Sequence, residues 1–153
     1  MIKKVLIAGD NHGDILGEAV QAELKNLKIE SEILARKEKD SYVEVCTKAI
    51  NEFKKDKTID GLVLICGTGI GASMVANRFK DVRAVLVKDK QTAYFARRHE
   101  NANCLCLAGG YTDGKMEVKP TQNLKAILAA FFKTEFEGGR HAKRTSELAK
   151  IGD

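Results

Sequence analysis

Five short apolar runs alternate with amphipathic stretches along this sequence, and this alternation restricts its fold more than any other feature. In the amphipathic stretches, apolar residues recur three and four positions apart, as on a helix with one buried face. The predicted strands cover 5–9, 29–34, 61–65, 82–87 and 103–108, and the predicted helices cover 15–27, 42–53, a segment from about 71, 91–99 and 124–132. The pattern predicts an α/β fold with a doubly wound, Rossmann-like parallel sheet of five strands in the order 2-1-3-4-5 and helices on both faces.

Length and composition indicate a single domain that spans residues 1–153. A chain of 153 residues can bury a substantial core but has little room for a second one. The glycine pair at 138 and 139 precedes a last short helix, so residues 135–153 are predicted to form a C-terminal helical arm. No apolar run approaches the roughly 20 residues of a membrane span, so no membrane partner is expected.

The cysteines and the net charge indicate the cellular compartment of the protein and the classes of partner that it binds. The four cysteines lack the paired spacing of a zinc site and the density of a disulfide scaffold, which predicts reduced thiols, no metal and a cytoplasmic protein. The net charge is +5, but basic and acidic residues are interleaved, so no nucleic-acid partner is expected. Arg140 and Arg144 stand out because they lie one helical turn apart, where both can bind one phosphate. A solvated helix end has the same composition.

Residues 62–77 place a cysteine between an apolar strand and a glycine-rich turn that opens a helix. Cys66 ends the strand, and the start of a helix favours both a thiolate and a bound anion. The backbone N–H groups that follow it belong to Gly67, Gly69, Ile70 and Gly71. Ligands of doubly wound sheets collect at the carboxyl ends of the strands, where Asp10 also lies. This edge therefore offers a base and an anion site together.

Other interpretations of the same turn remain open at this point. Residues 67–72 satisfy the GxGxxA pattern of dinucleotide sites, with Asp89 as the candidate ribose-binding carboxylate. Against this, the turn follows the third strand, and too little chain remains for two mononucleotide-binding halves. A phosphate-binding P-loop would need a Gly-Lys-Ser/Thr sequence that is absent here. The glycines could also serve backbone geometry alone.

Four motifs occur along the chain: ICGTGIGASMVAN, VRAVLV, the segment 93–103 and TEFEGGRHAKR. In this order they resemble the ribose-5-phosphate isomerase B family, which includes the galactose-6-phosphate isomerase subunits. The resemblance implies a cofactor-free aldose–ketose isomerase that acts as a homodimer, or as a dimer of dimers. It also implies active sites built across the interface, with the 135–153 arm packed on the partner subunit. Ribose 5-phosphate and ribulose 5-phosphate are the expected substrate pair.

The same resemblance assigns the catalytic roles. Cys66 is expected to remove the carbon-bound proton that moves between C1 and C2 through an enediolate. Thr68 adds a hydroxyl beside the reacting carbons, and the N–H groups of the glycine turn face the enediolate oxyanion. His99 is expected to assist ring opening from the partner subunit. Taken without the resemblance, a histidine in the position of His99 is more often a C-terminal helix cap.

Substrate binding is expected from both ends of the chain. Asp10 and Asn11 follow the first strand, and Tyr42 begins the second helix, where it lines the pocket or packs as an ordinary aromatic side chain. The family resemblance implies that Arg140 and Arg144 reach the substrate phosphate from the arm. A non-catalytic sugar-phosphate binding or regulatory protein is the alternative of a different class.

Three departures from the family pattern concern the substrate. Asn11 stands where a histidine is usual, with His12 displaced by one residue, and Gly110 stands where an arginine is expected. Glu100 replaces the asparagine that commonly follows the catalytic histidine. Each lost charge-assisted contact costs on the order of 1.5–3 kcal/mol if nothing replaces it. A shift of substrate to an allose, galactose or tetrose phosphate is therefore an open expectation.

Overall fold

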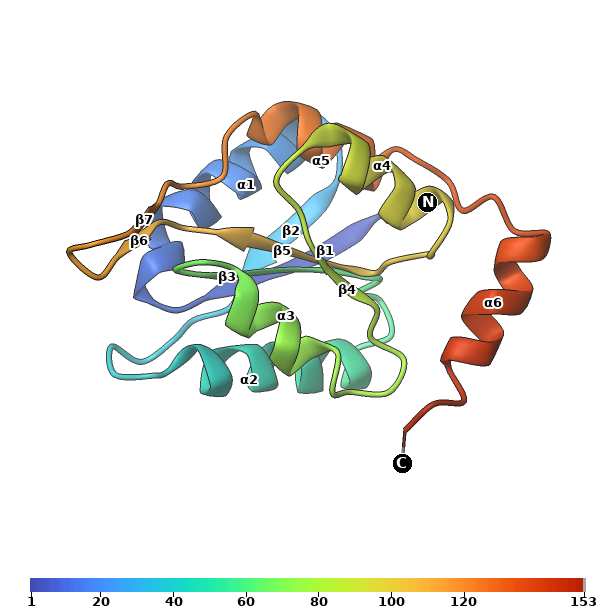
Figure 1. Cartoon of the computed structure of the whole chain (residues 1–153), viewed down its shortest axis with the longest axis horizontal. Helices are drawn as coiled ribbons and strands as arrows, with labels where there is room; N and C mark the ends of the chain where they lie inside the picture. Colours follow the sequence, from blue (N-terminus) through green and yellow to red (C-terminus); the bar gives the residue numbers. More distant parts are fainter. Residues whose placement is uncertain (153) are drawn as a thin grey trace.

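A parallel sheet lies between two layers of helices in the computed structural model, which describes residues 1–152 (Figure 1). The predicted α/β class with a five-stranded parallel sheet is confirmed. The strands of this sheet are β1 (Lys4–Gly9), β2 (Glu30–Ile33), β3 (Gly61–Cys66), β4 (Ala84–Leu86) and β5 (Cys104–Ala108).

The predicted order of the last two strands is wrong. The sheet runs β2-β1-β3-β5-β4, so β5 and not β4 pairs with β3, with Cys66 opposite Ala108. Every residue of β5 is buried, whereas all three residues of β4 are half-buried. A strand covered on both faces and both sides must be apolar throughout, so the run CLCLA occupies the interior and the shorter run takes the edge. The end of β5 therefore lies beside Cys66.

Alternate residues of each strand face opposite helix layers. Val63 and Ile65 belong to the core on one face of the sheet, while Leu64 and Cys66 belong to the core on the other face. The side chain of Cys66 therefore faces the layer formed by α2 and α3. The helices of the two layers are α1 (Asp14–Asn26), α4 (Lys90–Arg98) and α5 (Leu124–Phe132) on one face and α2 (Tyr42–Lys55) and α3 (Ile70–Ala76) on the other.

Two of these helices begin at caps that position the residues around the sheet edge. The Ser41 hydroxyl accepts the N–H of Glu44 (3.2 Å), and the Glu44 carboxylate accepts the N–H of Ser41 (3.3 Å), which forms a capping box and places Tyr42 first in α2. The Asp89 carboxylate accepts the N–H of Thr92 (2.7 Å) and caps α4. Asp89 thus has a structural role that the dinucleotide interpretation did not foresee.

Two features lie outside the sheet sandwich. A hairpin of β6 (Tyr111–Thr112) and β7 (Glu117–Val118), absent from the sequence prediction, follows β5. At the opposite end of the molecule, α6 (Arg140–Leu148) stands apart from the sheet as the C-terminal arm (Figure 1). None of the helices in residues 1–152 has the length and apolar character needed to cross a bilayer.

Candidate active site

Cys66 lies where the two central strands end, and the neighbouring loops fix its backbone. Its carbonyl accepts the N–H of Gly109 (2.9 Å), and the next carbonyl, of Gly67, accepts the N–H of Gly110 (3.0 Å). The Cys66 residue is only 4% exposed. These two hydrogen bonds join the segment after β5 to the end of β3, and they hold Cys66 at the carboxyl edge of the sheet.

The glycine turn wraps tightly around this strand end. Gly69 has φ +78°, and a Cβ there would lie 2.5 Å from Cδ1 of Leu86, so only glycine fits. The geometric interpretation of the turn is therefore correct for this residue. The N–H groups in the first turn of a helix have no acceptor within the helix, and the Thr68 hydroxyl takes one of them, that of Ile70 (3.2 Å). The remaining donors are available to a ligand.

Two tyrosines cover the turn from either side. The ring of Tyr42 lies over Gly71, where a Cβ would come within 2.6 Å of it, and Tyr111 lies over Gly67, where a Cβ would come within 2.9 Å. The structure thus brings the predicted residue Tyr42 to the glycine turn. Tyr111 was not predicted. The sequence signal for Tyr111 was its position shortly after the fifth predicted strand, because ligands in this fold class bind at the carboxyl ends of the strands.

Asp10 and His12 extend the same edge beside β1. Asp10 is 8% exposed, and its carboxylate accepts the N–H of His12 (3.0 Å) and lies 3.3 Å from Nδ1 of the His12 ring. The His12 ring meets Tyr111 edge to face, with centroids 5.5 Å apart. Asn11, the first residue of the short 3₁₀ turn η1 (Asn11–Gly13), is exposed. His12 therefore lies between the buried carboxylate and the hairpin.

The other three cysteines are buried in the interior, away from the carboxyl ends of the strands. Burial raises the pKa of the Cys46 thiol. A hydrogen bond with Cys104, whose sulfur lies 4.0 Å away, and then burial raise the pKa of Cys106 well above its usual range. Thiols in such surroundings stay protonated and unreactive at neutral pH. Cys66 is thus the cysteine whose position suits chemistry.

His99 lies at the opposite edge of the sheet. It is the C-terminal cap of α4, which runs back from the carboxyl end of β4. The segment after His99 is hydrogen-bonded to Arg83, which directly precedes β4. The side-chain Nε of Arg83 donates to the carbonyl of Asn101 (2.8 Å), and the backbone N–H of Arg83 donates to Oδ1 of Asn103 (2.8 Å). His99 therefore lies beside the amino ends of β4 and β5.

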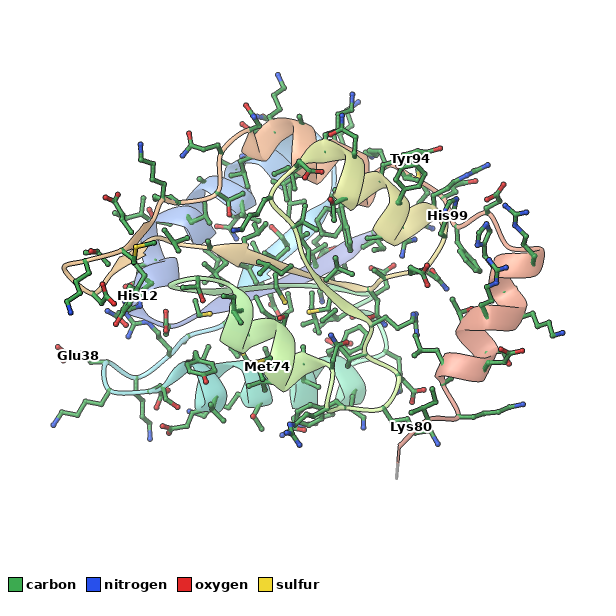
Figure 2. The ribbon with its side chains drawn as sticks, in the orientation of Figure 1. His12, Glu38, Met74, Lys80, Tyr94 and His99 are labelled. Carbon is green, nitrogen blue, oxygen red and sulfur yellow. The ribbon has the colours of Figure 1, made fainter. Side chains whose placement is uncertain are left out.

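One copy of the chain cannot bring Cys66 and His99 together. The six residues of β3 span about 20 Å, which is far beyond hydrogen-bonding reach. Figure 2 places His12, at the carboxyl edge with Cys66, and His99 at opposite ends of the molecule. The candidate site is therefore divided into two halves, which we call the turn half (Asp10, Tyr42, Cys66–Gly71) and the arm half (His99, Glu100, Arg140, Arg144).

The arm half includes two residues that the sequence prediction did not assign. The side chains of His99, Glu137 and His141 are the group of potential metal ligands found in residues 1–152, with ligating atoms within 4.8 Å of one another. The two imidazoles are stacked, with centroids 4.1 Å apart and 9° between their planes. An imidazole lone pair lies in the plane of its ring, so parallel rings cannot both point at one ion about 2.0–2.1 Å away. The group is a carboxylate beside two stacked imidazoles and not a chelate.

Cavities lie at both halves. One of about 380 Å³ lies beside His12, Gly110 and Tyr111 at the turn half. Another, of about 710 Å³, lies between α6 and the amino edge of the sheet and is bordered by Glu100 and Leu148. Arg140 and Arg144 are both exposed on α6, one helical turn apart. Both cavities leave room for a ligand or for a second chain.

The fold and the turn half are typical of α/β enzymes that bind a ligand at the carboxyl edge of a parallel sheet, and this chain carries a thiol at that edge. A family model described as Ribose/Galactose Isomerase matches residues 5–148. The chain belongs to this family, and the prediction of an isomerase is confirmed.

Relatives and solved structures agree with this assignment over almost the whole chain. The probable ribose-5-phosphate isomerase B of Mycoplasma genitalium is 35% identical over 149 residues, which cover 95% of this chain and 93% of that protein. A galactose-6-phosphate isomerase subunit LacA 2 of Streptococcus pyogenes is 29% identical over 147 residues, 96% of this chain and 98% of the subunit. The crystal structure of ribose-5-phosphate isomerase B from Mycoplasma genitalium with bound ribulose-5-phosphate superposes with a TM-score of 0.82 at 33% identity, over 98% of this chain and 96% of that one. The dinucleotide interpretation finds no support among these proteins.

Proposed function

We propose that the chain is an aldose–ketose isomerase that interconverts ribose 5-phosphate and ribulose 5-phosphate, with Cys66 as the base. The observation that carries this proposal is the Cys66 thiol at the carboxyl end of β3, next to the glycine turn and under Tyr42. A cytoplasmic location remains a prediction from the reduced thiols.

The two halves of the site divide the reaction between them. In ring opening, His99 takes the proton of the C1 hydroxyl, the bond between C1 and the ring oxygen breaks, and the ring oxygen gains a proton. The Cys66 thiolate then removes the C2 proton of the open-chain aldose, and the electron pair forms the enediolate. The Cys66 thiol returns a proton to C1 while the proton of the C2 hydroxyl passes to O1, which gives the ketose. The N–H donors of the turn stabilise the oxyanion, and each such donor contributes about 3–4 kcal/mol in related sites.

The division of the site supports a homodimer in which each active site takes its turn half from one subunit and its arm half from the other. Large apolar side chains are exposed on the elements that would meet: Met74 on α3, Phe95 on α4 and Leu148 on α6, which are 63%, 49% and 48% exposed. Such side chains are typical of a surface that another chain covers. The arm would then pack on the partner subunit, and a dimer of dimers remains a further prediction.

Phosphate binding is the part of the proposal in which this chain departs most from its family. Arg140 and Arg144 supply two guanidinium groups on one face of α6. At the turn half, Gly110 borders the 380 Å³ cavity, and so does His12, which follows Asn11 in the sequence. The two departures therefore fall at one place. A substrate larger or smaller than a pentose phosphate would be accommodated there.

A coupled assay over a panel of sugar phosphates tests the proposal: ribose 5-phosphate, allose 6-phosphate, galactose 6-phosphate and a tetrose phosphate. We expect the highest kcat/KM for ribose 5-phosphate and a loss of at least about 100-fold in Cys66→Ala, the scale of a missing proton-transfer group. Solvent deuterium should enter the ketose at C1 with the wild type and not with the variant.

Cys46→Ala is the matched control, because it removes a thiol that is buried away from the strand ends. It should keep the wild-type rate per folded protein. A Cys66→Ala variant with full activity would exclude the thiol as the base. Binding of the sugar phosphates without any deuterium exchange would instead support a non-catalytic binding protein.

A further inference from the structure

The Glu137 carboxylate lies beside the Nε2 edges of two stacked imidazole rings at the root of the arm. Its Oε2 atom is 3.2 Å from Nε2 of His141 and 3.7 Å from Nε2 of His99. Both rings thus turn the same nitrogen toward one carboxylate oxygen. The 3.7 Å contact with His99 is longer than a hydrogen bond, so the carboxylate acts on that ring through its negative charge.

The His141 ring is the buried member of this group. Its side chain is 7% exposed, and its Nε2 atom has no aligned hydrogen-bond partner within residues 1–152. A buried N–H that stays unpaired costs free energy, so a small rotation that aligns Nε2 with Glu137 is favoured. Because the two rings are stacked, two imidazolium charges there would repel each other, and the carboxylate opposes that repulsion.

The main chain holds Glu137 in this place. Its N–H donates to the carbonyl of Arg98 (2.9 Å), and its Oε1 lies 3.6 Å from Nη2 of the same arginine. On its other side, the His99 ring meets Phe95, with centroids 5.0 Å apart. The His99 ring therefore lies against Phe95, His141 and Glu137 with a third of its side chain still exposed, and the segment that begins the arm is joined to the end of α4.

We propose that Glu137 is a positioning residue of the isomerase: its carboxylate lies beside the Nε2 atoms of both His99 and His141, which favours a proton on Nε2 of His99 and leaves Nδ1 as its acid–base atom. A neutral imidazole carries its proton on one nitrogen and a lone pair on the other, so an acceptor at Nε2 selects this tautomer. This inference rests on the proposed ring-opening role of His99.

The test separates ring opening from carbon-proton transfer in the variant Glu137→Gln, which keeps the shape of the side chain. Turnover of ribose 5-phosphate needs its ring opened, whereas exchange of the C1 proton of ribulose 5-phosphate, an open-chain ketose, needs only the enediolate step. We expect kcat with the aldose to fall at least about tenfold, with KM and the ketose exchange rate changed less than about twofold. Glu137→Asp, which keeps the charge, should recover part of the loss.

Nitrogen-15 spectra of the free protein give a readout that does not depend on activity. The wild type should show His99 mainly as the Nε2–H tautomer, and Glu137→Gln should show a mixture. Glu135→Gln is the control, because Glu135 is exposed on the same segment and takes part in no ion pair within residues 1–152. It should leave spectra and rates unchanged.

The outcomes separate this inference from the proposed function. Unchanged spectra and aldose turnover in Glu137→Gln would overturn the positioning role, as would equal losses in aldose turnover and ketose exchange. A wild-type protein without deuterium exchange would overturn the proposed function instead. The tautomer of His99 would still report whether Glu137 orients the ring.

Discussion

The turn half and the arm half of the site are built in different ways. Cys66 sits at the end of a strand in which every residue is buried, and the glycines around it are packed against Tyr42, Tyr111 and Leu86. Arg140 and Arg144 lie on the exposed helix α6, which stands away from the sheet (Figure 1), and contacts around Glu137 hold the start of this arm. In the proposed function, the fold of one chain fixes the position of the base, whereas association of two chains would bring the acid and the phosphate ligands to it.

This difference predicts that the two halves respond differently to mutation. Changes in the turn half alter both stability and chemistry because that half is part of the core. Changes on the exposed arm alter substrate binding with little effect on the stability of the chain. The predictions below test whether the halves belong to separate subunits and whether they differ in this way.

The largest effect is expected from mixing two inactive variants, Cys66→Ala and His99→Asn. Each alone should have almost no activity with ribose 5-phosphate. If sites are shared across a dimer, half of the randomly mixed dimers are heterodimers with one intact site of two, so activity should return to about a quarter of the wild-type value. Refolding of equal amounts together, followed by the coupled assay, measures this.

The control for this experiment mixes Cys66→Ala with the double variant Cys66→Ala/His99→Asn. No dimer of these two chains contains an intact turn half, so no activity should return. If the first mixture also stayed inactive while forming heterodimers, the site would not be divided between subunits.

Removal of one arm guanidinium should have the next largest effect. Arg140→Ala and Arg144→Ala each lose a charge-assisted phosphate contact of about 1.5–3 kcal/mol, which is roughly a 10- to 150-fold loss in kcat/KM. The loss should appear mainly in KM, and the melting temperature should not change because both residues are exposed. Lys143→Ala, an exposed neighbour on α6, is the control. If all three variants kept the wild-type KM, the two arginines would not belong to the phosphate site.

Patterns in the sequence predicted the strands, the helices and the glycine turn, since these depend on local spacing of apolar residues and glycines. The order of the last two strands was wrong because it depends on which strand can be buried on both sides, and that is decided by competition within the sheet. The contrast between CLCLA and VRAVLV contained the information. Tyr111 and Glu137 were missed because each owes its place to tertiary contacts, with Gly67 and with the two histidines.

The smallest change, Gly109→Ala, tests whether the packing of the turn half limits its chemistry. A Cβ at Gly109 would overlap the carbonyl oxygen of His12, a main-chain atom that cannot turn aside. Relief requires a backbone shift, for which overpacked sites lose about 1–3 kcal/mol of unfolding free energy. The shift would also move the loop of Asp10 and the N–H that holds the Cys66 carbonyl, so kcat should fall together with the melting temperature.

Gly17→Ala is the matched control: its Cβ would meet Ile7 at an ordinary 3.7 Å inside α1, and a glycine-to-alanine change within a helix stabilises by about 0.5–1 kcal/mol. Thermal melts and the coupled assay on both variants measure the difference, and a Gly109→Ala protein as stable and active as the wild type would show that the turn half is less tightly packed than its contacts indicate.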